Sequence, residues 1–329
     1  MSYFFISCRT SFYNPRFKKL SLLILVLLLA VGVVGCGKSE DKRNFSIATG
    51  GTAGTYYPLG VAIAEILNKT LPNVQATAQS TGATIANINM LKEGSVDIAF
   101  VQNDIVYYAA NGLEMFEGKK VNNLRGLMTL YPEAIQIITL QNKDITKIED
   151  LKGKRIAVGP DGSGTEANTR QILQEYGLTY QDISPLYLPF AQAVSALLED
   201  KVDVIFVTAG VPTVAIETLA QKNKLRMIGI SEDKIQSLMF KYPFYSKISI
   251  NQATYDGVTQ NINSIAVRAM LVANNKINAQ DGYDITKAIL NNAKKLSEAH
   301  MVGKLIVKET ATEGMPIEMN EGAIKFLKE

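Results

Sequence analysis

Two glycine-rich loops carry the residues of this chain that are best suited to holding a small ligand. Residues 50–60 follow the short apolar stretch 45–48, and residues 159–165 follow the similar stretch 156–158. Glycine lets the backbone approach a ligand closely, and the first amides of a following helix point outward with the positive end of its dipole. Such helix ends hold anions, and the hydroxyl groups of both loops add neutral donors and acceptors. Two facing loops of this kind predict a cleft for a small polar ligand.

The simpler interpretation is that each glycine stretch is only a tight turn between a strand and a helix. For one loop alone the two interpretations are equally good, because glycine-rich turns are common. The second copy favours a shared site. Neither loop fits G-x-G-x-x-G or G-x-x-x-x-G-K-[ST], so a nucleotide-phosphate loop is disfavoured.

The N-terminal segment has the pattern of a lipoprotein export signal. Four basic residues precede an apolar run over residues 20–34, and Val33, Val34, Gly35 and Cys36 resemble a lipobox. The alternative is an uncleaved membrane anchor, but the run is shorter than the roughly 20 residues that a spanning helix needs. We expect a signal peptide over residues 1–35, lipidation (palmitate) at Cys36, a tether over residues 36–44, and an extracytoplasmic location in the periplasm or on the outer face of the cell membrane.

Charge and reactive side chains exclude several classes of function. Residues 1–35 hold four basic residues and no acidic one, so their removal changes the formal net charge from +3 to −1 and leaves no electrostatic footprint for nucleic acid. The two cysteines, Cys8 and Cys36, both belong to the signal and its cleavage site, and His300 is the single histidine. We expect His300 to pack at the end of a helix. A zinc site or a histidine-based triad is therefore improbable, and we expect no metal, no cofactor and no enzymatic activity.

The elements that would position the loops occur twice along the chain. Each glycine loop leads into a helix, a strand, a second helix and then a buried strand that begins with Val-Asp, at residues 96–101 and 202–207. This alternation predicts two related α/β lobes with a mainly parallel sheet. We expect the aspartate of each Val-Asp pair to have a structural role or to contact solvent.

A length of 329 residues also favours two lobes. Residues 124–140 read as two apolar strands around Tyr131, Pro132 and Glu133 that cross between the lobes, and we expect a return crossing near residues 246–264. Residues 262–274 read as either a strand or a buried helix. The predicted boundaries are 45–133 plus 250–329 for lobe I and 134–249 for lobe II.

Polar residues follow both Val-Asp strands, at the carboxyl ends where open α/β sheets bind ligands. They are Gln102, Asn103 and Asp104 in the first lobe and residues 208–213 in the second. Asn103 and Thr208 could equally cap helices.

Together, residues 50–60, 102–104, 162–165 and 210–213 resemble the TAXI family, the extracytoplasmic solute receptors of TRAP transporters. The chain departs from the family at Asn103, where serine is common, and at residues 320–321, Asn-Glu in place of His-Pro. The resemblance implies a two-lobed α/β periplasmic-binding-protein fold of type II with a ligand cleft between the lobes. It also implies a receptor that closes on a small organic anion, such as glutamate or a dicarboxylate, and delivers it to a TRAP-type permease.

We predict that a carboxylate of the solute bridges the two loops, and that no residue transfers a proton. The residues expected at the ligand are Gly51, Thr52, Gly54, Thr55, Ser163, Gly164 and Thr165 for the carboxylate, with Tyr56, Gln102, Asn103, Thr208 and Gly210 orienting the rest. Asp161 is expected to face solvent or to bind a ligand amine. Because these loops contain no arginine, amides and hydroxyls should hold the anion, and Arg125, Arg170 and Arg268 remain candidate bidentate partners.

Other functions stay open at this point. A sensor or surface lipoprotein without a transport role, or the binding component of an ABC-type importer, would use the same fold. An enzyme on this scaffold would need a base, for which the loops offer only Asp104 and Asp161. We expect a monomer that partners with the membrane through its lipid and with a permease.

Overall fold

Strands alternate with helices through most of the chain. The computed structural model describes residues 42–221 and 224–329, and residues 42–329 cluster into one compact unit. The predicted signal peptide, the lipidation of Cys36 and nearly all of the tether lie outside the described residues. Within them, no helix is long and apolar enough to cross a membrane.

The strands belong to a single mixed sheet. Their bounds are β1 (Arg43–Ala48), β2 (Val74–Gln79), β3 (Ile98–Gln102), β4 (Leu124–Leu140), β5 (Arg155–Ala157), β6 (Ser184–Leu186), β7 (Val204–Ala209), β8 (Leu225–Ile228), β9 (Ser246–Ile250) and β10 (Ile262–Asn274). The order is β2-β1-β3-β10-β4-β7-β5-β6, with β8 paired to β4 and β9 to β10. Pairing is parallel among β1, β2 and β3 and among β5, β6 and β7, but antiparallel wherever β4 or β10 takes part. The predicted parallel sheet is therefore present at each end, and antiparallel strands join the two ends.

Helices connect and cover these strands. The α-helices are α2 (Tyr56–Thr70), α3 (Thr84–Glu93), α4 (Asn103–Asn111), α5 (Gly164–Glu175), α6 (Phe190–Leu198), α7 (Val214–Ala220), α8 (Glu232–Lys241), α9 (Ala279–Leu290), α10 (Ala293–Ala299) and α11 (Glu321–Lys328). Short 3-10 helices are η1 (Glu114–Phe116), η2 (Ile148–Leu151), η3 (Met301–Leu305) and η4 (Lys308–Thr310). The predicted repeat is present, because β1-α2-β2-α3-β3 has the same order of elements as β5-α5-β6-α6-β7.

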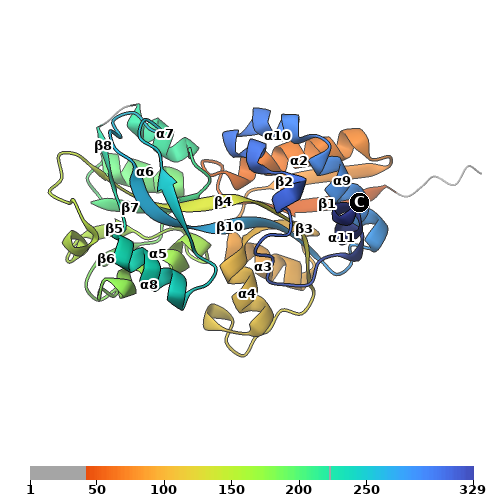
Figure 1. Cartoon of the computed structure of the whole chain (residues 1–329), viewed down its shortest axis with the longest axis horizontal. Helices are drawn as coiled ribbons and strands as arrows, with labels where there is room; N and C mark the ends of the chain where they lie inside the picture. The colour runs from red at the N-terminus through yellow and green to blue at the C-terminus, as the bar shows by residue number, and fades with distance from the viewer. Residues whose placement is uncertain (1–41, 222–223) are drawn as a thin grey trace, which may run out of the picture. The chain divides into compact units, whose positions relative to one another are not determined.

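Two long strands run through both halves of this unit. In Figure 1, β4 and β10 lie side by side across the middle, with β1, β2 and β3 on one side and β5, β6 and β7 on the other. Residues along each strand pack in different cores. On β4, Tyr131 packs in the core of the first half and Ala134 in that of the second. On β10, Ile265 packs in the second half and Ala269 in the first.

Two expectations about this region need correction, and one open alternative is resolved. Residues 124–140 form one continuous strand and not two, and of the two alternatives for residues 262–274 the strand is confirmed. The return crossing is β10, whereas Ser246–Ile250 forms β9, which pairs antiparallel with the start of β10. Hydrophobic periodicity alone could not separate a strand from a buried helix here, since a strand that is buried on both faces is apolar throughout. The lobe boundaries remain a prediction.

Asn320 explains how the last helix begins without the expected His-Pro pair. Its side-chain oxygen accepts hydrogen bonds from the amides of Gly322 at 2.9 Å and Ala323 at 3.3 Å. This is an N-cap, and asparagine is among the best residues for it. The departure at residue 320 therefore replaces one helix start with another.

The aspartates of the two Val-Asp pairs have the same structural role. Asp97 accepts hydrogen bonds from the amide and the hydroxyl of Ser46, both at 2.8 Å. Asp203 accepts one from the amide of Arg155 at 2.9 Å. In each half the strand that follows pairs with its neighbour through only two residue pairs, so the carboxylate extends a short parallel ladder.

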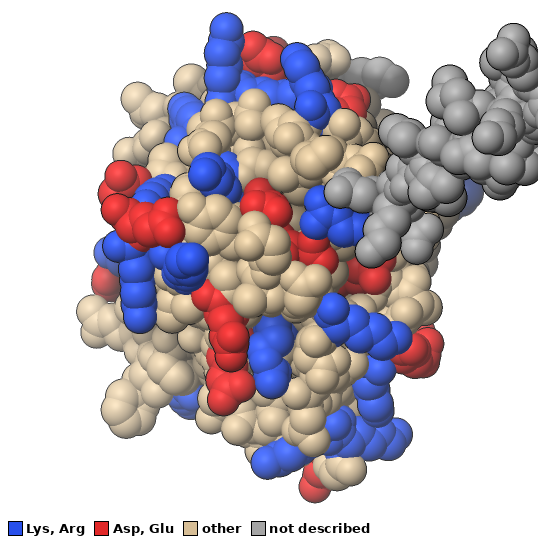
Figure 2. Space-filling model, turned by 90° about the vertical axis from the view of Figure 1, so that its right-hand side faces the viewer, with Lys and Arg blue, Asp and Glu red and all other residues tan. Residues whose placement is uncertain are grey.

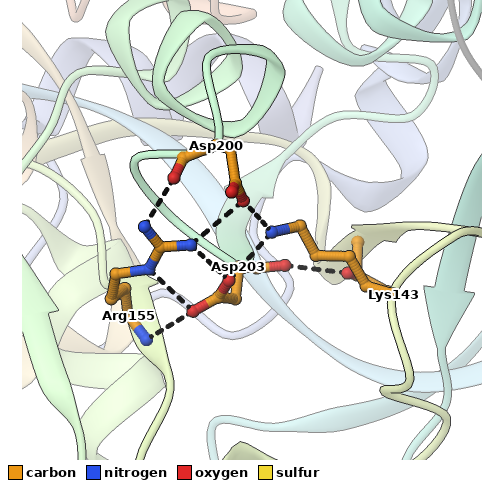
Figure 3. Close-up of polar contacts among 5 residues, drawn as sticks. Lys143, Arg155, Asp200 and Asp203 are labelled. Carbon is orange, nitrogen blue, oxygen red and sulfur yellow. Dashed lines mark hydrogen bonds and ion pairs between the residues drawn. The ribbon is translucent and has the colours of Figure 1, made fainter.

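Asp203 adds an ion-pair cluster to this role (Figure 3). Its oxygens lie 2.7 Å from the Arg155 guanidinium and 2.8 Å from Lys143 Nζ, and Asp200 contacts the same two cations. The hydrogen bonds from Arg155, with those from Lys143, hold the pKa of Asp203 well below its usual range despite partial burial. A depressed carboxylate pKa means that the ionised group stabilises the fold above about pH 4, and that this stabilisation is lost as the pH falls further.

We predict that Asp203→Asn lowers the free energy of unfolding by about 1–2 kcal/mol at pH 7, because it removes charge-assisted bonds to a largely buried side chain. Denaturant titration at pH 7 and pH 3 measures the effect, which should shrink at the lower pH. Asp200→Asn is the matched control. It shares both cations but its side chain is 76% exposed, so its effect should be clearly smaller. Equal losses in the two variants would contradict the role given to Asp203.

Candidate ligand-binding site

The two glycine loops lie on one cavity of about 330 Å³. Its lining comes from four regions of the chain: the first loop with the start of α2, the segment before α3, the second loop with the start of α5, and the start of α6. Gln102, Glu133 and Thr208 complete it from β3, β4 and β7. The shared cavity is the arrangement that the paired loops predicted.

Each loop is shaped by a specific backbone contact. In the first, the Gly54 amide donates to the Gly51 carbonyl at 3.0 Å, and Thr55 ends the loop without a side-chain capping bond. In the second, Gly159 has a φ of +107°, and a Cβ there would lie 2.8 Å from the Thr165 side chain, so only glycine fits. Ser163 caps α5 by accepting from the Glu166 amide at 3.2 Å. The first residues of α2 and α5 thus lie at the cavity, although the Ser163 hydroxyl and the Glu166 amide are already bonded to each other.

Hydrogen bonds and close packing connect the two halves at the cavity. The Ile85 amide donates to the Gly162 carbonyl at 3.1 Å, and the Ala215 amide donates to the Ala53 carbonyl at 3.2 Å. Gln102 lies against Gly164 so closely that a Cβ at position 164 would be 1.5 Å from Gln102 Oε1. The structure therefore represents a closed arrangement in which both loops belong to one enclosure.

Ten of the twelve residues expected at the ligand line the cavity. They are Gly51, Thr52, Gly54, Thr55, Tyr56, Gln102, Ser163, Gly164, Thr165 and Thr208. Asn103 and Gly210 do not. The Asn103 side chain accepts from the Arg268 amide at 3.0 Å, and the Gly210 carbonyl accepts from the Thr213 hydroxyl at 2.8 Å. The alternative that Asn103 and Thr208 cap helices is wrong, because Asn103 is the first residue of α4 and Thr208 lies within β7.

The charged candidates all lie away from the cavity lining. Asp161 is exposed, as the first of its two alternatives predicted. Asp104 is buried and accepts from Asn168 Nδ2 at 2.9 Å, and burial raises its pKa to about 6. Three glutamate-paired arginines, Arg125, Arg170 and Arg268, also lie outside the lining. His300 is buried at the start of η3, where Nδ1 accepts from the Val302 amide, so the helix-end prediction is confirmed.

Sequence reasoning missed several lining residues. Glu133 was noted only as part of the crossing segment. Ser80 and Thr81 before α3, Thr84 at its start, and Phe190 and Gln192 on α6 were not predicted at the ligand. A usable signal existed for Glu133, since an acidic residue inside an apolar strand must be paired or have a function. Ser80 and Thr81 bind the carbonyls of Gly50 and Thr49, both at 2.9 Å, and so support the first loop.

Glu133 is the one carboxylic acid in the lining. Its side chain comes from β4, the residue is 2% exposed, and Oε2 accepts a hydrogen bond from the Tyr56 hydroxyl at 2.8 Å. Burial raises the pKa of Glu133 to about 8; hydrogen bonds from Tyr56 and Gln102 oppose the rise, and the charge of Asp104 adds to it. The group is therefore mostly neutral at pH 7.

Three buried polar atoms around Glu133 and the loops lack hydrogen-bond partners within the described structure. They are Gln102 Oε1, the Tyr131 hydroxyl and Thr208 Oγ1. Buried polar atoms are nearly always hydrogen-bonded, so such a group needs an explanation. Gln102 and Thr208 line the cavity, which points to a polar ligand there. In the described ranges, no group of three or more histidine, cysteine or acidic side chains could hold a metal ion.

Two solved structures of binding proteins have the same fold. The periplasmic binding protein BugD matches with a TM-score of 0.56 at 12% identity, over 87% of this chain and 96% of that one. The alkanesulfonate-binding protein SsuA from Xanthomonas axonopodis pv. citri, bound to MOPS, matches with a TM-score of 0.50 at 17% identity, over 88% and 85%. These likenesses show a periplasmic-binding-protein fold of type II.

The NMT1-like family model matches residues 47–329. The chain belongs to the NMT1-like family. The narrower resemblance to the TAXI family stays a prediction.

We predict that Glu133→Gln stabilises the ligand-free protein increasingly as the pH rises from about 4.5 to 8. Over that range the unfolded chain loses the Glu133 proton while the folded chain keeps it, so the wild type loses stability. The gain at pH 8 should reach at least about 1 kcal/mol, since one pKa unit corresponds to about 1.4 kcal/mol. Denaturant titrations at pH 5 and 8 measure it. Glu232→Gln, at the exposed end of α8, is the control and should leave the difference between the two pH values unchanged.

Proposed function

We propose that this protein is an extracytoplasmic solute receptor that closes on a small organic anion, glutamate-like or dicarboxylate-like, and delivers it to a TRAP-type permease. The observation that supports this most directly is the single cavity between the amino-terminal ends of α2 and α5. Both helices exceed eight residues, and their first amides converge with hydroxyl groups on one small space. This set of donors suits a carboxylate.

The donors are neutral, which fits a receptor that must release its ligand. In the part of the chain that the structure describes, no arginine or lysine lines the cavity, so backbone amides and the hydroxyls of Thr52, Thr55 and Thr165 would hold the carboxylate. Amide donors fixed by the fold need no reorganisation on binding. None of these groups needs to react with the solute.

Binding couples to closure through the contacts between the halves. The bonds of Ile85 to Gly162 and of Ala215 to Ala53 connect the two sides of the cavity and would break on opening. A ligand that touches both loops binds the closed form more tightly and shifts the population toward it. The permease would recognise the closed form.

The proposed location follows from the N-terminal segment. The signal peptide and a lipid on Cys36 would place the body outside the cytoplasm, tethered to a membrane. On the face shown in Figure 2, basic and acidic side chains are interspersed, which suits a small-molecule receptor better than a nucleic-acid-binding protein. We propose a monomer.

A role as the binding component of an ABC-type importer is the second candidate. The similarity to the alkanesulfonate-binding protein SsuA favours it, because that protein binds an organic anion. The cavity would serve either transporter, so the distinction lies in the partner. Copurification with a multi-span permease without an ATPase subunit would support the TRAP-type reading, and an associated ATPase would support the ABC-type one.

We predict that glutamate or a short dicarboxylate raises the melting temperature of the purified protein, and that Thr165→Ala weakens this shift. Thr165 is 4% exposed and lies at the start of α5 in the cavity lining. Losing one hydrogen bond to a charged ligand should weaken binding about tenfold or more. Calorimetry on the wild type and the variant measures the change.

Thr218→Ala is the matched control for this test. Its hydroxyl donates to the Val214 carbonyl on the exposed face of α7, away from the cavity, so ligand binding should be unchanged. Absence of any response to organic anions, amino acids included, would contradict the proposed function.

A further inference from the structure

The cavity has an unusual balance of charges. Among residues 42–221 and 224–329, Glu133 is the only carboxylic acid that lines it, and no lysine, arginine or histidine does. An anion alone would meet helix amides at the loops, but it would gain nothing from Glu133 once that group ionises. A buried acid without a cation is costly unless a partner arrives with the ligand.

The surroundings of Glu133 present acceptors more than donors. Tyr56 of α2 already gives its hydroxyl proton to Glu133 Oε2, and the side-chain amide of Gln102, on β3, hydrogen-bonds to the same carboxyl group. This leaves Gln102 Oε1 as a buried acceptor without a partner, beside a carboxylate that has further lone pairs. The unpartnered Gln102 Oε1 and the remaining lone pairs of Glu133 suit a group that carries several N–H bonds.

The other ionisable groups near Glu133 do not supply a positive charge. Asp104, at the start of α4, acts on it with like charge, and Tyr131 on β4 and Tyr56 on α2 are phenols whose pKa burial raises further. On β10, the apolar Val267 pairs with Glu133, and the next residue, Arg268, forms an ion pair with Glu313 and lies outside the cavity lining. The positive charge that would balance Glu133 has to come from the solute.

We propose that Glu133 is the ammonium-binding, specificity-determining residue of the cavity, and that the solute is an α-amino acid, with its carboxylate on the loop amides and its ammonium group on Glu133 and Gln102. This inference rests on the proposed function and narrows it, because it separates amino acids from dicarboxylates. The ammonium group keeps its protons, and the proton of neutral Glu133 leaves to water when the pair forms. Binding at pH 7 therefore releases close to one proton, and affinity rises with pH up to about 8.

A ligand without an amino group would behave in the opposite way. It would use the neutral carboxyl group of Glu133 as a donor, would release no proton, and would bind more weakly above pH 8. The sign of the pH dependence thus separates the two kinds of solute at the same site.

The test uses ligand pairs that differ only in the amino group: glutamate with glutarate, aspartate with succinate, alanine with propionate and leucine with 4-methylpentanoate. Calorimetry of the purified protein at pH 7, in phosphate and in Tris, gives both affinity and proton release. We expect at least one amino acid to bind at least tenfold more tightly than its partner acid and to release close to one proton. We expect Glu133→Gln to abolish the proton release and to weaken the binding of that amino acid at least tenfold.

Controls make each failure distinct. Glu133→Gln keeps an acceptor for Tyr56, and an unchanged melting transition at pH 5 shows that it folds; Glu232→Gln on α8 should bind as the wild type does. If the acids bind and their amino acids bind no better, or if no proton is released, the inference is wrong and the proposed function stands. If no member of any pair binds, both are wrong.

Discussion

The continuity of β4 and β10 is the constraint on which the rest of this structure depends. The two strands pair antiparallel with each other, and each contributes to the core on both sides of the cavity. Because the parallel strands of each half attach to them, the two glycine loops are brought to the same side of one sheet. β4 also carries Glu133 of the cavity lining, between Tyr131, which packs in the core of the first half, and Ala134, which packs in that of the second.

The charge of the cavity lining depends on which groups the fold places there and which it pairs elsewhere. Arginines that could have bound an anion are paired with glutamates elsewhere, and the donors at the loops are backbone amides at helix ends. Amides carry no net charge to be desolvated, whereas burial raises the pKa of Glu133 to about 8 and keeps its carboxyl group mostly neutral at pH 7. Recognition of charge is thus divided between helix dipoles and one titratable side chain.

Much of this arrangement could be predicted from the sequence, because it depends on local patterns. Glycine loops after apolar strands, and the repeated Val-Asp strands, were enough to place ten lining residues. The failures involve partners far apart in the sequence. Asn103 was expected at the ligand, but its oxygen is taken by the Arg268 amide, 165 residues away. Glu133 reaches the cavity only because β4 crosses between the halves, and nothing local to residue 133 specifies that crossing.

The carboxylates of Asp97 and Asp203 make the same contact in the two halves. Both receive the backbone amide of the neighbouring parallel strand at the same register position, from Ser46 in one half and from Arg155 in the other. The amide contact is common to both halves, while the side chains around it differ, a hydroxyl in one and an ion-pair cluster in the other. Each half therefore completes its short parallel ladder with the same carboxylate contact, and the side chains around that contact can differ without loss of the ladder.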